Sequence, residues 1–87
     1  MEPDYVEAIL EWSAGGPAPE TRAWFVQRGF RTMPMRVGLL ISADRATFER
    51  VFGVELRDAD PPVELTVPLG LTAAVASIVI PKPRQFH

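Results

Sequence analysis

The side chains that carry out most enzyme chemistry are scarce in this 87-residue chain. It has no cysteine, and its one histidine is the last residue, His87. The composition therefore excludes a disulfide scaffold, a thiolate metal site and a cysteine nucleophile, and it argues against a multi-histidine metal site or a Ser-His-Asp triad. Gly15-Gly16 is the nearest approach to a phosphate-binding loop. No lysine followed by Ser or Thr comes after it, so we interpret it as a turn.

Two carboxylate pairs are the remaining candidates for acid–base or metal chemistry. On a strand, Glu7 and Glu11 would lie on one face about 13 Å apart, which is too far to share a proton. Asp58 and Asp60 stand just before Pro61, a composition typical of a solvated turn rather than of a set of metal ligands. We therefore expect no catalytic residues, no cofactor and no metal site, and we expect the chain not to be an enzyme.

The first third of the chain predicts a strand followed by a helix. Residues 5–12 alternate apolar side chains with glutamates, as a half-buried strand does, and a helical spacing of other apolar residues there is the alternative. A helix is expected over 19–28, because Pro19 suits the first helical position and Gly29 suits a left-handed C-cap. Four consecutive apolar residues predict that this helix is buried over much of its circumference: Ala23, Trp24, Phe25 and Val26.

The central segment predicts a second strand and a second helix. Extended character runs over 30–42, with an early break at Met33-Pro34-Met35 and its strongest part from Val37 to Ser42. Asp44 is expected to cap a helix over 45–52, which Gly53 ends. The predicted core face of this helix consists of Phe48, Val51 and Phe52. The residues expected to face water are Arg45, Glu49 and Arg50.

The last third predicts short extended segments and one helical turn. An extended segment is expected at 54–57 and resumes at 63–67 after an acidic turn, a helical turn starts at Pro68, and a last strand is expected at 77–80. The order strand, helix, strand, helix, strand, strand indicates an α+β fold, a ferredoxin-like split βαβ arrangement with an antiparallel sheet and two helices on one face. We expect residues 1–80 to form this single domain and residues 81–87 to form an extended C-terminal tail.

The aromatic residues divide into a predicted core and a predicted anchor. Six of them are interpreted as core, with a ligand pocket or an interface as the alternative: Trp12, Trp24, Phe25, Phe30, Phe48 and Phe52. Phe86 follows the last strand, where no core remains, which makes it a candidate anchor for a partner. The predicted partner-binding residues are Pro81, Lys82, Pro83, Arg84 and Phe86. The alternative for this tail is a frayed terminus.

The charges are unevenly distributed, although the net charge is only −2. The first 20 residues carry only acidic side chains, and residues 22–36 carry only basic ones. We interpret these segments as neighbours in the fold that neutralise one another, with a partner-facing basic strip as the alternative. No nucleic-acid partner is expected, because Lys and Arg are not in excess, and no membrane association is expected, because no segment reaches the ~18 apolar residues of a span. The N-terminus lacks a signal-peptide pattern, so we expect a cytoplasmic protein if the chain is complete and a secreted one if it is an excised propeptide.

Residues 38–56 resemble the central signature of the pro-kumamolisin activation domain, the propeptide of sedolisin-type serine-carboxyl peptidases. That family shows a strand, a polar cap and a helix ending in Ala-Phe-Gly-Val-x-Leu, and here the chain reads Val51-Phe52-Gly53-Val54-Glu55-Leu56. Residues 24–30 resemble the family's preceding helix, and residues 67–75 resemble its Val-Pro segment before the final strand. The resemblance implies a ferredoxin-like, non-catalytic module that assists folding of the attached peptidase and blocks its active site until cleaved.

Our leading hypothesis is thus a propeptide-like module that binds a protein partner, by resemblance a sedolisin-type serine peptidase that it inhibits or helps to fold. One alternative is a protein-interaction domain or homodimer unconnected to a peptidase. Another is a small-molecule site or cofactor-free enzyme, for which a closed pocket lined by Trp12 and Trp24 would be the sign. An exposed apolar sheet face would favour the first hypothesis, and a sheet face buried between two copies would favour the second.

Overall fold

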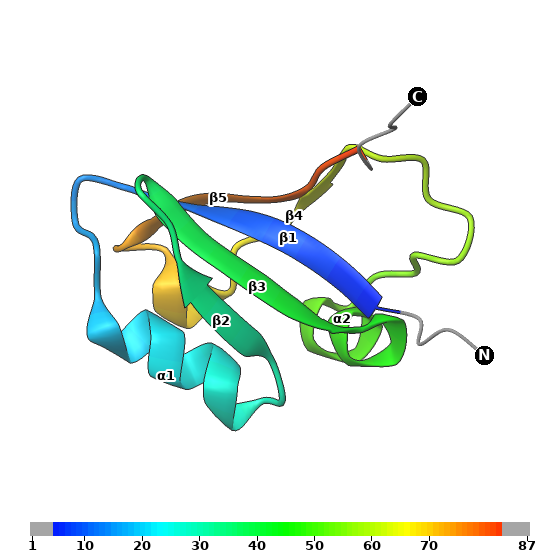
Figure 1. Cartoon of the computed structure of the whole chain (residues 1–87), viewed down its shortest axis with the longest axis horizontal. Helices are drawn as coiled ribbons and strands as arrows, with labels where there is room; N and C mark the ends of the chain where they lie inside the picture. The colour runs from blue at the N-terminus through cyan, green and yellow to red at the C-terminus, as the bar shows by residue number, and fades with distance from the viewer. Residues whose placement is uncertain (1–4, 83–87) are drawn as a thin grey trace.

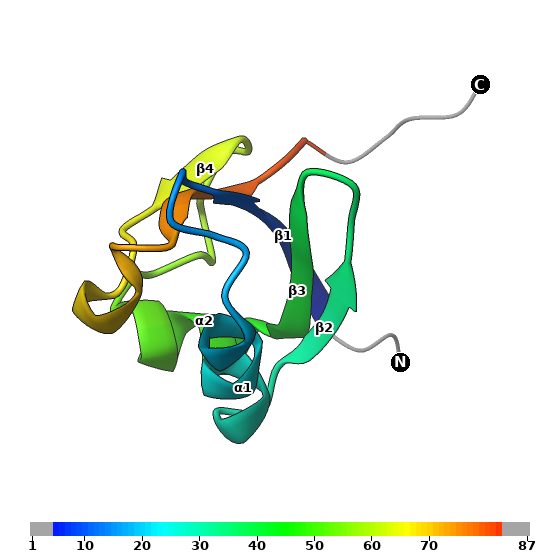
Figure 2. The same ribbon diagram turned by 90° about the vertical axis from the view of Figure 1, so that its left-hand side faces the viewer.

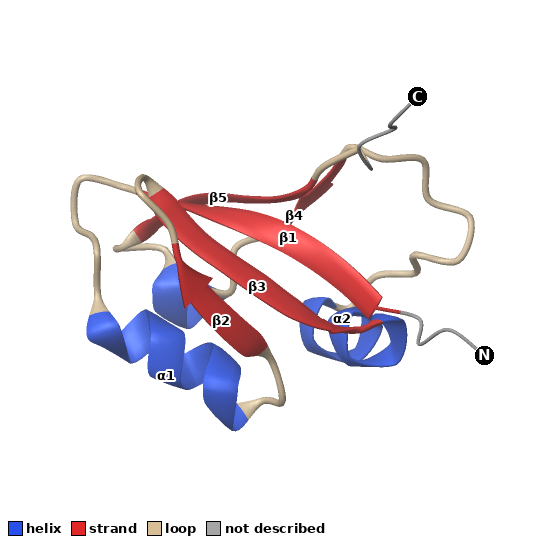
Figure 3. Cartoon of the chain, in the orientation of Figure 1, coloured by secondary structure: helices blue, strands red, loops and turns tan. Residues whose placement is uncertain are grey.

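The first strand of the chain lies at the centre of a five-stranded antiparallel sheet in the computed structural model, which describes residues 5–82. Both α-helices cover one face of this curved sheet, and no described helix or strand lies over the other face, which is called the uncovered face below (Figures 1, 2 and 3). The elements in chain order are β1 (Tyr5–Trp12), α1 (Pro19–Gln27), β2 (Arg31–Pro34), β3 (Gly38–Asp44), α2 (Arg45–Phe52), β4 (Val63–Leu65), the 3₁₀ turn η1 (Leu69–Leu71) and β5 (Val75–Ile80).

The strand order β2-β3-β1-β5-β4 confirms the predicted fold class. Two βαβ units are interleaved: β3 lies between β1 and the edge strand β2, and β1 lies between β3 and β5. All neighbouring pairs are antiparallel, as a ferredoxin-like arrangement requires. The short strand β4 pairs with β5 and is the second edge strand of the sheet.

The single strand expected between the two helices is in fact a hairpin. Pro34 ends β2, and the N–H of Met35 donates to the carbonyl of Gly38, at 2.9 Å, where β3 begins. Gly38 is required there for a second reason, since a Cβ atom would collide with the Leu10 carbonyl on β1. The Met-Pro-Met break in the sequence therefore marks a turn between paired strands, not an irregular start to one strand.

The strand expected at 54–57 does not form. The N–H of Val54 donates to the carbonyl of Glu49, and the N–H of Leu56 donates to the Glu49 side chain, so this segment folds back along α2. Its alternating Val54 and Leu56 are half-buried against the core instead of facing one side of a sheet. In a strand these N–H groups would donate to a neighbouring strand, but here they donate to acceptors on α2.

The core lies between the helices and the covered face of the sheet. Ala8 and Leu10 on β1, Ile41 on β3 and Ile78 on β5 are fully buried, as is expected for alternate residues of strands with one covered face. Four phenylalanine rings pack over them, with centroid separations of 5.0–6.2 Å: Phe25, Phe30, Phe48 and Phe52. The aromatic residues thus contribute the bulk of the helix-side core, with Trp12, Trp24 and Phe52 only partly buried.

The prediction that α1 is buried over much of its circumference is wrong. Only Thr21 and Phe25 of this helix are buried, and Val26 is 53% exposed. Trp24 lies at the margin, where the Arg28 guanidinium stacks on its ring at 3.8 Å. In a two-layer fold a helix has only one neighbour to pack against, so one face of α1 remains exposed.

The predicted helix signals of α2 are confirmed. Asp44 is the N-cap, its Oδ1 accepting the N–H of Thr47 at 2.8 Å, and Gly53 is the C-cap with a left-handed φ of 67°. Hydrogen bonds from the side chain and the backbone of Thr47 lower the pKa of the Asp44 carboxyl from its ordinary value of 3.8. The cap therefore fixes where β3 ends and α2 begins.

Replacing Phe48 should test the dependence of the fold on the aromatic core. Phe48 is fully buried between Phe30 and Phe52, so Phe48→Ala should lower the free energy of unfolding by about 3–5 kcal/mol in urea denaturation. Leu69→Ala is the control: Leu69 is 92% exposed, and its truncation should change stability by less than about 0.5 kcal/mol. Equal effects of the two variants would contradict the proposed core.

The Asp44 cap should make part of the stability pH-dependent. Because folding lowers its pKa, the stability from ionised Asp44 is complete above 3.8 and is lost as the pH falls through the lower folded-state pKa. Asp44→Asn keeps an N-cap acceptor but removes this titration. The stability difference between wild type and variant, measured by urea unfolding from pH 7 to pH 2, should shrink at low pH; a constant difference would refute the assignment.

Candidate partner-binding surfaces

An apolar row crosses the uncovered face of the sheet. Ile9 on β1 is paired with Leu40 on β3 on one side and with Val79 on β5 on the other, and Leu40 is paired with Met33 on β2. Met33 is 60% exposed, and the other three side chains are half-buried. The register thus aligns apolar residues of four strands in one row, and no helix or strand within residues 5–82 lies over that face of the sheet (Figure 2).

Charged residues border this row, and their signs differ from one side of the face to the other. Glu7 and Glu11 flank Ile9 on the same face of β1, and Glu64 on β4 is paired with Val79. Arg31 lies on β2, two residues before Met33. Arg31 and Glu7 are both paired with Ser42, from opposite sides, so β3 separates the basic edge from the acidic centre. Glu7 and Arg31 therefore lie one strand apart, and the neutralisation of the acidic by the basic segment stays a prediction.

Both edges of the sheet are poorly suited to adding a strand. The edge strand β2 is only four residues long, and its Pro34 has no N–H to donate. At the other edge, β4 is only three residues long, with Pro62 immediately before it and Pro68 soon after. A partner is therefore better placed on the face of the sheet than on its edges.

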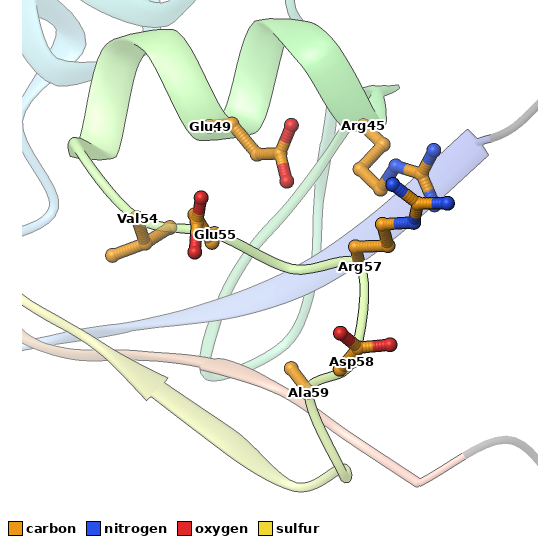
Figure 4. A pocket seen from close by; sticks show the side chains of 7 residues that line it. All are labelled: Arg45, Glu49, Val54, Glu55, Arg57, Asp58 and Ala59. Atoms are coloured by element: carbon orange, nitrogen blue, oxygen red, sulfur yellow. The ribbon is translucent and has the colours of Figure 1, made fainter.

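A groove of about 770 Å³ lies between α2 and the segment that follows it (Figure 4). Its lining is mostly charged: Arg45, Glu49, Val54, Glu55, Arg57, Asp58 and Ala59. The guanidinium ends of Arg45 and Arg57 extend to the same end of the groove (Figure 4). Glu49 was expected to face water, yet its Oε2 accepts the N–H of Leu56 at 2.7 Å and forms part of the groove wall.

A smaller, apolar pocket of about 170 Å³ adjoins this groove. It is lined by Val6, Arg45, Leu56, Ala59, Pro61, Val63 and Ile80. Arg45 and Ala59 line both hollows. The sequence did not reveal either hollow, because the segment that builds them was interpreted as a strand. The one signal in the sequence against a strand was the acidic stretch that follows this segment and ends in prolines, because such a stretch does not occur inside a sheet.

The predicted tail lies mostly outside the described residues. Pro81 and Lys82 directly follow β5 and are exposed. Pro83, Arg84 and Phe86 fall outside the range that the structure describes, so their predicted role in partner binding is not tested.

The other candidate sites from the sequence have structural roles. Gly15-Gly16 forms a turn, as predicted, and it passes so close to Ala73 and Ala74 that a Cβ atom on either glycine would collide with a carbonyl. Among residues 5–82, no cluster of three or more metal-binding side chains occurs, and every buried polar side-chain atom has a hydrogen-bond partner. Neither helix within the described range is long and apolar enough to cross a bilayer.

Fold and surfaces together define a small ferredoxin-like α+β domain with an uncovered apolar sheet face. Comparison of the chain with protein-family models, with curated proteins and with solved structures found no match. Its function is therefore argued from its own surfaces.

The hydrogen bond between Glu49 and Leu56 should hold the groove wall in place. Glu49→Ala should cost about 1 kcal/mol and should speed hydrogen exchange at the Leu56 amide, whereas Glu49→Gln keeps an acceptor and should preserve most of the protection. Glu55→Ala, which removes a neighbouring exposed carboxylate, is the matched control. Unchanged exchange at Leu56 in Glu49→Ala would show that the bond does not order this segment.

Proposed function

We propose that this chain is a non-catalytic, propeptide-like module that binds a protein partner, with a serine-carboxyl peptidase of the sedolisin type as the partner that it inhibits or helps to fold. The observation that carries the proposal is the uncovered apolar row of Met33, Leu40, Ile9 and Val79 on a ferredoxin-like sheet. The resemblance of residues 38–56 to a propeptide family supports the choice of partner.

The anatomy of the uncovered face is that of a protein interface. Interfaces combine an apolar centre with a polar or charged rim, and here the apolar row is bordered by Glu7, Glu11 and Arg31. Covering exposed apolar area stabilises a complex by roughly 25 cal/mol per Å², so the exposed Met33 is well placed to act as an anchor. Because both edges carry prolines, we place the partner on this apolar face.

We assign a second contact with the partner to the C-terminal tail. Pro81 follows β5 directly, and its ring fixes a backbone angle before binding, which lowers the ordering cost of an extended segment. Arg84 and Phe86 would then supply a charge and an apolar anchor in the cleft of the partner, as an extended strand in the β-strand-addition mode.

The charge distribution favours one alternative, in which the partner is a second copy of the chain. Arg31 lies at the β2 side of the face, whereas Glu64 lies at the β4 side. Two copies stacked face to face about a two-fold axis parallel to the strands would place the basic side of each face over the acidic side of the other. This homodimer would use the same apolar row.

An inhibition assay on purified serine-carboxyl peptidases would test the proposal. The intact chain should inhibit, and Met33→Glu, which places a carboxylate in the apolar row, should weaken inhibition about tenfold or more. Val26→Glu makes a similar change on the exposed side of α1 and should have no effect. A chain ending at Ile80 should also inhibit less if the tail enters the cleft.

Three results would distinguish the alternatives. Absence of inhibition across the peptidases tested, together with a monomeric mass in sedimentation equilibrium, would overturn the proposal. A dimer that Met33→Glu dissociates would favour the second copy as partner. Inhibition that is identical for the chain ending at Ile80 would remove the tail from the mechanism and leave the sheet face as the binding surface.

A further inference from the structure

We propose that the β2 flank of the molecule binds a segment of a protein partner that carries both carboxylate and apolar side chains. The β2 flank consists of exposed residues from α1, from β2 and from the turn between β2 and β3: Arg22, Val26, Arg31, Met35, Arg36 and Val37. It shares only Arg31 with the border of the uncovered sheet face. The inference therefore goes beyond the proposed function and does not rest on it.

The composition of this part of the chain is that of a protein interface. The segment from Thr21 to Ala43 contains four arginines and no lysine, aspartate or glutamate. Arginine and methionine are enriched in interfaces, whereas lysine, aspartate and glutamate are depleted there. Among residues 5–82, six large apolar side chains are exposed, and four of them lie in this segment: Val26, Met33, Met35 and Val37.

The fold brings the residues of the β2 flank to one side of the molecule. Arg22 on α1 donates from Nε to the hydroxyl of Thr32 on β2 at 2.8 Å, which joins the helix to the strand. Val26 comes four residues after Arg22, so both lie on the same side of α1. Arg31 directly precedes Thr32, and Figure 2 shows β2 and the turn after it at one side of the molecule, with α1 beside β2.

The guanidinium groups of the β2 flank are available to an anionic ligand. Within residues 5–82, no ion pair joins Arg22, Arg31 or Arg36 to a carboxylate. The bond from Arg22 to Thr32 uses Nε alone, so both terminal nitrogens can still donate to a carboxylate. This bond also holds the side chain in place before binding, which lowers the ordering cost of the complex.

The carboxylates of the neighbouring elements lie outside the β2 flank. Glu7 and Glu11 are on β1, with β3 between them and β2. Glu20 comes two residues before Arg22 and therefore lies on a different side of α1. The flank thus combines positive charge with exposed apolar area, and a complementary ligand combines carboxylates with apolar side chains. Side chains make this contact, because β2 with its Pro34 is poorly suited to strand pairing.

A protein segment fits these features better than an anionic membrane does. A membrane surface attracts arginine and lysine alike, whereas the flank has only arginine, and Arg22 is held in a fixed position. Paired hydrogen bonds from a guanidinium to a carboxylate make use of such fixed geometry. The net charge of −2 also opposes the approach of the chain to an extended anionic surface.

The test is an NMR titration of the ¹⁵N-labelled chain with acetyl-Glu-Glu-Leu-Leu-Glu-Glu-amide. When this peptide is extended, each of its sides carries one leucine between two glutamates. The amide signals of residues 31–33 and 35–37 should shift. The same peptide with glutamine in place of every glutamate should bind at least tenfold more weakly.

Two pairs of variants, all at exposed positions, test the charged and the apolar parts of the flank. Arg36→Gln should weaken binding of the acidic peptide about tenfold, whereas Arg50→Gln, which removes the same charge from α2, should not. Val37→Ser removes apolar area from the turn and should weaken binding about threefold. Leu69→Ser is its control, because Leu69 is equally exposed to solvent but lies outside the flank.

The outcomes separate this inference from the alternatives and from the proposed function. Equal affinities for the acidic peptide and its glutamine counterpart, an unaltered affinity of Arg36→Gln, or the absence of shifts at residues 31–37 would each overturn the inference. Binding to vesicles of phosphatidylserine and phosphatidylcholine without binding to the peptide would also overturn it, and would assign the flank to a membrane surface. Peptide binding by a chain that inhibits no peptidase would support the inference and count against only the proposed function.

Discussion

The structure depends on the burial of one sheet face under a layer of phenylalanine rings. The central strand β1 contributes Ala8 and Leu10 to this contact, and β3 and β5 continue it on either side. Phe25 and Phe48 bring the two helices onto the same layer, and Phe30 lies in ring contact with both. A chain of this size has room for only one such core, and none of the helices or strands within residues 5–82 lies over the opposite face of the sheet.

The candidate binding surfaces are a consequence of this single core. Alternation along β1 places Ile9 on the uncovered face because Ala8 and Leu10 must face the helices. The groove arises in a similar way, since the chain that leaves α2 is bound back to it through Glu49 instead of joining the sheet. One face of the sheet and the segment after α2 therefore present surface that other elements among residues 5–82 do not cover.

Two of the sequence predictions that failed share one physical cause. The run Ala23 to Val26 looked buried on all sides, but a helix in two layers has one covered face, and Val26 is exposed. The segment Val54 to Arg57 had the alternation of a strand, but its N–H groups found acceptors on the preceding helix. The local sequence pattern indicates which side chains are apolar enough to be buried. Which of them are buried depends on how the neighbouring elements pack and pair.

The sequence by itself determined both helices, the first and last strands and the fold class. Proline at position 19, Asp44 and the glycines at 29 and 53 place helix ends through backbone angles and hydrogen bonds that act within a few residues. Only the tertiary structure decided the register that aligns Met33, Leu40, Ile9 and Val79, and the juxtaposition of Arg45 with Arg57. These groupings join residues distant in the chain, and they depend on pairing and packing energies that no local pattern contains.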